Sequence, residues 1–196
     1  CQTLRRRLCD NRGRSLARTG NAVSGKFFVG IILVSALIVG GAIYYLQIYG
    51  YYREIPASSP AAEIRLTTLA GVAEPVTASD FRGIDADSSP IRYRACFRME
   101  QSAAMLAGTY QAYDGAEPLV TPGWFTCFDA GVIDAALEEG RATAYMGEEN
   151  IYWGIDRIVA IMDDGRAFAW NQINKCGAEV FDGQPAPAGC PPQPEK

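Results

Sequence analysis

The feature that most limits the fold of this chain is an uncharged stretch of 20 residues, FFVGIILVSALIVGGAIYYL, at positions 27–46. At 1.5 Å per residue, a helix of this length spans about 30 Å, the hydrocarbon thickness of a bilayer. Aromatic rings with a polar tip favour the headgroup interface. Five tyrosines crowd the end of the stretch: Tyr44, Tyr45, Tyr49, Tyr51 and Tyr52. We therefore expect a transmembrane helix over residues 27–52.

Two alternatives compete with a membrane span. A buried core helix is usually shorter and polar on one side. A cleaved signal peptide has an apolar core of roughly 7–15 residues followed by a small-x-small site, and neither the length nor the site fits here.

The segment before the span, residues 1–26, carries seven basic residues and one acidic residue, whereas the rest of the chain carries 11 basic and 21 acidic residues. This division favours two different environments, and the acidic part argues against nucleic-acid binding because phosphate would repel it. A bacterial gene can start on a valine codon, and residues 1–22 lack apolar periodicity. We expect translation to start at Val23, which makes residues 1–22 an annotation extension; the alternative is a basic cytoplasmic tail that contacts anionic lipid.

The chain contains no histidine. Its absence excludes Ser-His-Asp and Cys-His catalysis, histidine-ligated zinc and haem, and histidine phosphorelay. No phosphate-binding loop, nucleophile elbow or dinucleotide fingerprint is present either. The sequence therefore predicts no catalytic residue, no metal and no cofactor, and we do not expect an enzyme.

Composition divides the chain beyond the span. A linker rich in Pro, Ser and Ala occupies residues 53–62, a segment with globular patterning covers residues 63–182, and a Pro-rich tail covers residues 183–196. The patterning predicts an α+β fold: a mostly antiparallel sheet domain with one or two short helices, after the N-terminal transmembrane helix.

Alternating apolar and polar residues predict strands over residues 63–71, 90–99 and 141–149. In the second of these, Arg92, Arg94, Cys96 and Arg98 form the face opposite the apolar one. Residues 155–173 contain two alternating runs, which predict a hairpin with a type I′ turn at Asp164-Gly165.

Two helices are expected within the domain. The first runs from its cap, Ser102, and ends before Gly108. The second has Asp129 as its N-cap, with Gly140 past its end.

Four cysteines lie beyond the span, widely separated and without a C-x-x-C motif, which indicates disulfides rather than a metal site. They are Cys96, Cys127, Cys176 and Cys190. Three pairings are possible, and we favour Cys96–Cys127 and Cys176–Cys190. Disulfides persist outside the cytoplasm, so we expect the N-terminus in the cytoplasm and the domain in the periplasm of a bacterial inner membrane. Four buried free thiols in a cytosolic domain are the alternative.

Carboxylate motifs favour structural roles. The stretch from Asp85 to Ser89 opens like a calcium loop, but Pro90 and Cys96 stand where such a loop needs Gly and Glu, so a polar turn is expected. Glu138-Glu139 should be a solvated helix end. Glu148 and Glu149, with Asp156 nearby, could suit acid–base work, but adjacent strand residues point to opposite faces.

Aromatic residues fall into two groups. Trp124, Phe125 and Phe128 surround Cys127 and are expected to fill the core, or alternatively to form a protein-contact patch.

The second group lies in residues 147–157, which break the period of two and are expected to form a surface loop. We expect this loop to bind a partner through Glu148, Glu149, Tyr152 and Trp153, because Tyr and Trp are enriched at binding hot spots. The alternative is that Trp153 folds inward.

The stretches SGK, IDADSSPIRYRACF, GWFTCFDA, GEENIYWGIDRIVA and DGQPAPAGCPP resemble an uncharacterised family of small single-span alphaproteobacterial proteins. The resemblance covers residues 23–194, implies a start at Val23 and an envelope location, and implies no activity or site residues.

We therefore expect a bitopic inner-membrane protein. Its partners would be the lipid bilayer and an envelope protein that the periplasmic domain binds as an accessory subunit or assembly factor. The alternative is a membrane-tethered periplasmic enzyme or small-ligand-binding domain.

Overall fold

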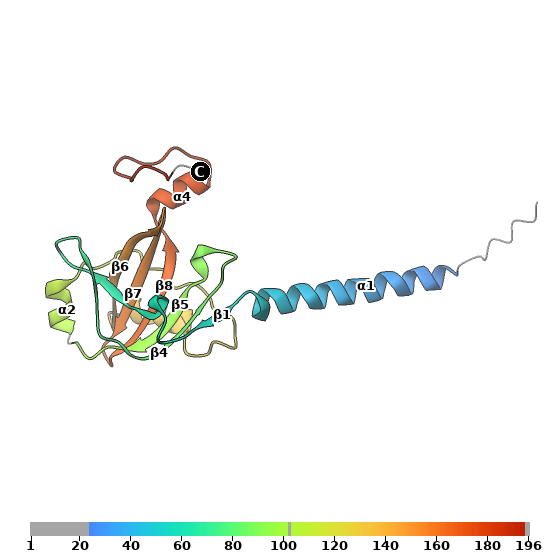
Figure 1. The fold of residues 1–196 in the computed structure, drawn as a ribbon, viewed down its shortest axis with the longest axis horizontal. Helices are drawn as coiled ribbons and strands as arrows, with labels where there is room; N and C mark the ends of the chain where they lie inside the picture. Colours follow the sequence, from blue (N-terminus) through green and yellow to red (C-terminus); the bar gives the residue numbers. More distant parts are fainter. Residues whose placement is uncertain (1–23, 102, 195–196) are drawn as a thin grey trace, which may run out of the picture. The chain divides into compact units, whose positions relative to one another are not determined.

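The computed structural model describes residues 24–101 and 103–194 (Figure 1). Val23, the expected start, and Ser102, the expected helix cap, lie outside the described residues. The chain divides into two compact units between Ile43 and Tyr44.

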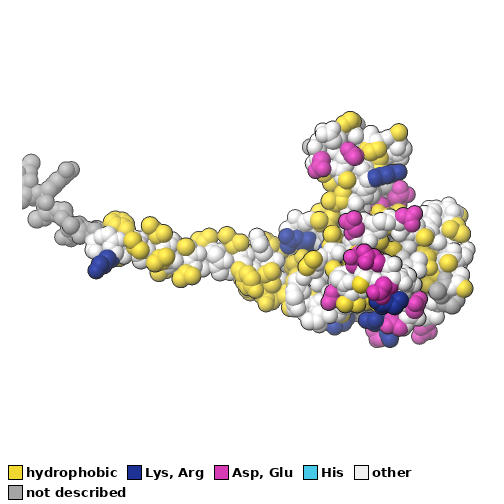
Figure 2. All heavy atoms as spheres, turned by 180° about the vertical axis from the view of Figure 1, so that it is seen from behind, with side chains coloured by type: hydrophobic (Ala, Val, Ile, Leu, Met, Phe, Trp, Pro, Cys, Tyr) yellow, Lys and Arg dark blue, Asp and Glu magenta, His cyan; other side chains and the backbone are white. Residues whose placement is uncertain are grey.

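The helix near the N-terminus is α1 (Gly25–Tyr45), which continues into a π-helical turn, η1 (Leu46–Gly50). Most side chains of α1 are hydrophobic and none of its residues is buried; the face in Figure 2 shows these hydrophobic side chains along the helix. Within the described residues, Gly25–Gly50 is the one helical stretch that is long and apolar enough to cross a membrane. A candidate membrane helix followed by a folded domain fits a bitopic protein.

The second unit is built on a sheet that has six strands within the described residues, all antiparallel, in the order β1-β4-β5-β8-β7-β6. These are β1 (Arg53–Ile55), β4 (Ser79–Asp85), β5 (Arg94–Arg98), β6 (Ala142–Tyr152), β7 (Ile155–Met162) and β8 (Arg166–Ile173). A separate hairpin pairs β2 (Arg65–Thr67) with β3 (Ala73–Pro75).

The short helices of the described residues are α2 (Ala103–Thr109), α3 (Ala130–Glu138) and α4 (Lys175–Phe181), with 3₁₀ turns η2 (Pro60–Ala62) and η3 (Pro90–Arg92). The predicted α+β fold with a mostly antiparallel sheet is confirmed. Asp129 caps α3 as predicted, since its Oδ1 accepts a hydrogen bond of 3.2 Å from the backbone N–H of Val132.

Both faces of the sheet are covered. On one face, β2 and α2 pack over residues such as Val159 and Ala169; on the other, α3 and residues 113–128 pack over Ile158 and Trp170. Every residue of β7 is therefore buried. The same cover explains why Arg94 and Cys96, predicted to lie opposite the apolar face of their strand, are buried as well.

The hairpin between β7 and β8 is present, but the predicted type I′ turn is wrong. That turn needs a positive φ at both central residues, and Gly165 has one (+80°) whereas Asp164 does not. The connection is instead a loop of three residues, 163–165, closed by a hydrogen bond of 3.0 Å from the Gly165 N–H to the Met162 carbonyl. Glycine in the left-handed conformation at the third position is the usual solution for a three-residue loop.

Two further expectations need correction. The predicted linker, residues 53–62, begins as β1, which pairs with β4 in register Arg53↔Asp85 and closes one edge of the sheet. The predicted surface loop, residues 147–157, continues β6 and opens β7, with register shifts on either side of Glu148. These bulges interrupt the period of two without ending the strand.

Candidate functional site

Two disulfides fix the surfaces on which function could reside. Cys96 on β5 is bonded to Cys127, with 6.3 Å between their Cα atoms, and Cys176 on α4 is bonded to Cys190, with 5.8 Å. This is the pairing that the sequence favoured. The first disulfide ties residues 120–131 to the sheet, and the second ties the Pro-rich tail to α4.

The predicted partner-binding residues lie together where β6 turns into β7. Tyr152 is 53% exposed, Glu149 is exposed, and Glu148 is half-buried. One oxygen of Glu148 lies 3.7 Å from a guanidinium nitrogen of Arg65. The turn therefore presents an aromatic ring and two carboxylates, one of them already engaged by the neighbouring strand.

Trp153 differs from Tyr152 because the C-terminal segment packs on it. Its ring meets the Phe181 ring edge-on, with 6.2 Å between centroids, and its Nε1 donates a hydrogen bond of 3.1 Å to the Pro191 carbonyl. Trp153 is half-buried as a result. Phe181 itself is 54% exposed, so it adds an exposed apolar ring next to Trp153. The lobe formed by α4 and the tail shows hydrophobic, acidic and basic side chains together (Figure 2).

A polar network holds this turn against α4. The carboxylate of buried Asp156 accepts hydrogen bonds of 2.8 Å from the Asn150 N–H and from the Asn174 side-chain amide. Asn174 caps α4 in turn, because its Oδ1 accepts from the N–H groups of Cys176 and Gly177, each at 3.0 Å. Asp156 is therefore a structural acceptor rather than a free acid–base group.

The turn and the helix touch through their backbones. A Cβ at Gly177 would lie 2.2 Å from the Gly154 carbonyl oxygen, so only glycine fits there. Tyr113 completes the cluster, with its hydroxyl 3.5 Å from Asp156. Burial and the neighbouring Asp156 carboxylate raise the pKa of Tyr113 to about 12.

The remaining carboxylate candidates are engaged at the surface. Asp87 pairs with Arg53, which lowers the Asp87 pKa, and Asp85 accepts from the Ala86 N–H. Glu138 and Glu139 are exposed at the end of α3, and Glu139 pairs with Arg141 at 2.6 Å. Within the described residues, no group of three or more His, Cys, Asp or Glu side chains could hold a metal ion.

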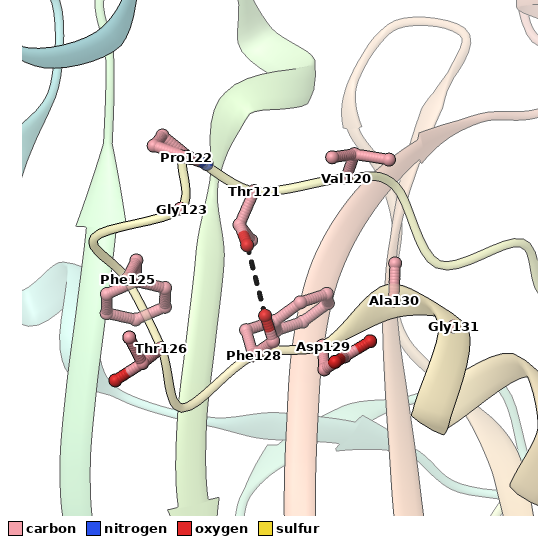
Figure 3. Close-up of a pocket in the computed structure, with 10 residues that line it drawn as sticks. All are labelled: Val120, Thr121, Pro122, Gly123, Phe125, Thr126, Phe128, Asp129, Ala130 and Gly131. Carbon is pink, nitrogen blue, oxygen red and sulfur yellow. Dashed lines mark hydrogen bonds between the residues drawn. The ribbon is translucent and has the colours of Figure 1, made fainter.

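A second candidate surface lies in residues 120–131, which fold back on themselves (Figure 3). The Thr121 hydroxyl donates a hydrogen bond of 3.0 Å to the Phe128 carbonyl, which closes the loop. Phe125 and Phe128 are buried in the core as expected. Trp124 is only half-buried.

Trp124 instead contacts the segment that follows α1. Its Nε1 donates a hydrogen bond of 2.7 Å to the Ile48 carbonyl. Its ring stacks on Tyr49, with 6.3 Å between centroids, and meets Tyr52 edge-on at 6.1 Å. The sequence did not reveal this contact, because 76 positions separate Trp124 from Ile48.

Buried Arg94 on β5 holds the residue before this loop, Leu119, by a hydrogen bond. Its guanidinium donates to the carbonyls of Leu119 at 3.0 Å and Ile91 at 2.7 Å. Burial lowers the pKa of Arg94 to about 10, so its side chain remains cationic at neutral pH.

The same loop encloses a pocket of about 420 Å³ between residues 120–123 and the first turn of α3 (Figure 3). Its one carboxylate is that of Asp129, which already caps the helix. The pocket therefore offers a ligand a partly apolar surface, and its one carboxylate is already engaged by the backbone of α3.

A family of unknown function (DUF6446) has a family model that matches residues 64–191, about two thirds of the chain. The chain belongs to this family. No curated protein and no solved structure matches the chain.

The match to DUF6446 is shorter than residues 23–194, the range of the resemblance. It includes both candidate surfaces up to Pro191, together with all four domain cysteines, and it leaves out α1 and the tyrosines that follow it. The matched range therefore covers most of the domain, and the candidate membrane helix lies before it.

Proposed function

We propose that this protein is a non-catalytic bitopic protein of a bacterial inner membrane whose periplasmic domain binds an envelope protein. It would act as an accessory subunit or assembly factor of a membrane complex. The observation that carries the proposal is the exposed ring of Tyr152 on a turn that the hydrogen bonds of buried Asp156 hold in place.

The rigidity of this turn supports a binding role. Ordering a mobile loop on binding costs free energy, so a contact surface that is already fixed binds more tightly. Asp156 and Asn174 fix the turn from within, and the exposed ring of Tyr152 offers the residue type that most often forms a binding hot spot.

Two disulfides support a periplasmic location, because such bonds persist on the oxidising side of a membrane. The engagement of Asp129 and Asp156 in structural hydrogen bonds supports a role without catalysis.

Co-purification in mild detergent tests the proposal, with Tyr152→Ala and Glu149→Gln as variants. If Tyr152 is a hot spot, Tyr152→Ala weakens the complex about 30-fold while the melting temperature stays close to that of the parent protein. Leu69→Ala and Glu138→Gln are matched controls, since Leu69 is 63% exposed and Glu138 is exposed, both outside this turn.

Trp153→Ala separates binding from folding. This variant should lower the melting temperature, because the ring packs on Phe181 and its Nε1 is hydrogen-bonded to the tail. If Tyr152→Ala and Glu149→Gln both retain every co-purified protein that Leu69→Ala retains, this turn is not the interface.

A further inference from the structure

A continuous row of aromatic rings joins the end of α1 to the domain. Tyr45, the last residue of α1, stacks on Tyr49 with 5.8 Å between ring centroids, and Tyr49 stacks on Trp124. Tyr45 is 61% exposed and Tyr49 is 47% exposed. The row is therefore exposed at its Tyr45 and Tyr49 end, whereas Trp124 is half-buried against the core.

The row begins where the apolar span ends. Tyr49 lies four residues beyond Tyr45, in the π-helical turn that follows α1 directly. Tyr and Trp rings concentrate at this depth, the headgroup level of a bilayer. Because Trp124 stacks on Tyr49, the chain brings a loop of the domain to the same level.

Two arginines flank the row. The Arg92 guanidinium lies 5.4 Å from the centroid of the Tyr52 ring, and that of Arg82 lies 5.8 Å from the centroid of Phe125, whose ring meets Trp124 edge-on. Across residues 24–101 and 103–194, no carboxylate forms an ion pair with either one. Both cations thus remain available to an anion from outside the chain.

We infer that the aromatic row Tyr45, Tyr49, Tyr52 and Trp124, with Arg82 and Arg92, binds the phosphate headgroups of the bilayer that α1 crosses. The domain then has a lipid contact of its own, in addition to the helix. The rings supply amphipathic contact at the interface and the two guanidinium groups supply hydrogen bonds to phosphate oxygens.

A bilayer suits this surface better than a protein partner for two reasons. The surface is continuous with the end of the membrane span, and its charged groups are both cationic, which complements phosphate.

The test uses the full chain in nanodiscs of phosphatidylglycerol brominated near the headgroup, with tryptophan fluorescence as the readout. We expect the brominated lipid to quench the tryptophan fluorescence of the parent protein and of Trp153→Phe. In Trp124→Phe, most of this quenching should be lost. Trp153 is the control because it contacts Phe181 and Pro191 instead. The inference is overturned if Trp124→Phe remains quenched as strongly as the parent protein.

A double variant distinguishes headgroup binding by the domain from closeness to the lipid that results only from its connection to α1. Near an anionic surface each basic side chain contributes about fivefold to the docked population. Arg82→Gln with Arg92→Gln should therefore make Trp124 markedly more accessible to acrylamide in the nanodisc. The control is Arg98→Gln with Arg166→Gln, which removes the same charge from two paired residues at the far end of β5 and β8.

Equal acrylamide accessibility in the two double variants would overturn the inference. So would protection of Trp124 that needs native membrane proteins and is absent in nanodiscs of pure lipid, because the surface would then be a protein contact.

Discussion

The indole Nε1 of Trp124 donates a hydrogen bond of 2.7 Å to the backbone carbonyl of Ile48. The last carbonyl groups of a helix have no partner within the helix, and here a loop 76 positions away supplies one. The segment after α1 is thereby attached to the domain by a side chain rather than by the chain connection alone.

Trp124→Phe should weaken this attachment while keeping the ring. Losing one hydrogen bond to a backbone carbonyl costs about 1 kcal/mol, so the amides of Tyr51 and Tyr52, which close the π-helical turn, should exchange about fivefold faster. Hydrogen exchange of the full chain in detergent measures this, with Trp153→Phe as the control. Unchanged exchange at both amides would show that the hydrogen bond does not hold the turn.

Both disulfides should stabilise the domain, and the longer loop should contribute more. The chain-entropy model gives about 3.7 kcal/mol for the separation of 31 between Cys96 and Cys127, and about 3.0 kcal/mol for the separation of 14 between Cys176 and Cys190. Denaturation of the two Cys→Ser pairs measures the loss. Maleimide should find no free thiol among these four cysteines in the native protein, and labelling of any one of them would contradict the pairing.

Tyr113 should make stability fall at alkaline pH. Burial and Asp156 raise its pKa to about 12, so its contribution is complete below the ordinary tyrosine pKa of about 10 and is lost as the pH rises through the folded value. Subtracting the absorbance titration of Tyr113→Phe from that of the parent protein isolates the ionisation of the Tyr113 phenol. Asp156→Asn should lower the midpoint but leave it above the ordinary value, because desolvation is the larger cause. A midpoint in the ordinary tyrosine range for the parent protein would contradict the half-buried position of Tyr113 beside Asp156.

Asn174→Ala should loosen α4. Loss of an N-cap costs about 1–2 kcal/mol, and Asp156 also loses its amide donor. Limited proteolysis should cut residues 175–194 sooner than in the parent protein. Asn174→Asp is the informative comparison, since it can keep the cap but places a carboxylate beside Asp156. If Asn174→Ala resists the protease as well as the parent protein, Cys176–Cys190 alone holds the helix.

The location can be tested directly. Alkaline phosphatase fused after Lys196 should be active, because that enzyme needs an oxidising compartment for its own disulfides. An inactive but stable fusion would place the domain in the cytoplasm.

Sequence patterning predicted the parts of this fold that depend on local periodicity and capping. The β7–β8 hairpin and the Asp129 cap of α3 are local signals, and the structure contains both. β1 has only three residues beside a Pro-rich stretch, so nothing local marked it as a strand. α4 was missed for a similar reason, because its seven residues follow a strand at once and include Gly177.

The candidate sites were predictable to a lesser degree. Their residue types pointed to Tyr152 and Trp153 as binding residues. In the structure Tyr152 is exposed and Trp153 is half-buried, because Phe181 and Pro191 contact Trp153. The contact between Trp124 and Ile48 could not be predicted. It requires that the Cys96–Cys127 disulfide hold the loop of Trp124 on the sheet, and that a carbonyl at a helix end have no partner within the helix. Such contacts depend on the assembled sheet.

The position of β8 within the sheet affects how the chain folds as it is made. β8 lies between β5 and β7, yet it is the last strand in the sequence. A ribosome making about 5–20 residues per second completes β1, β4 and β5 several seconds before residue 173 is joined. During that interval one side of β5 has no strand to pair with, and an open strand edge is a template for aggregation. A nascent chain interrupted between Arg98 and Arg166 would keep that edge open, so degradation or chaperone binding should act most strongly on truncated chains of these lengths.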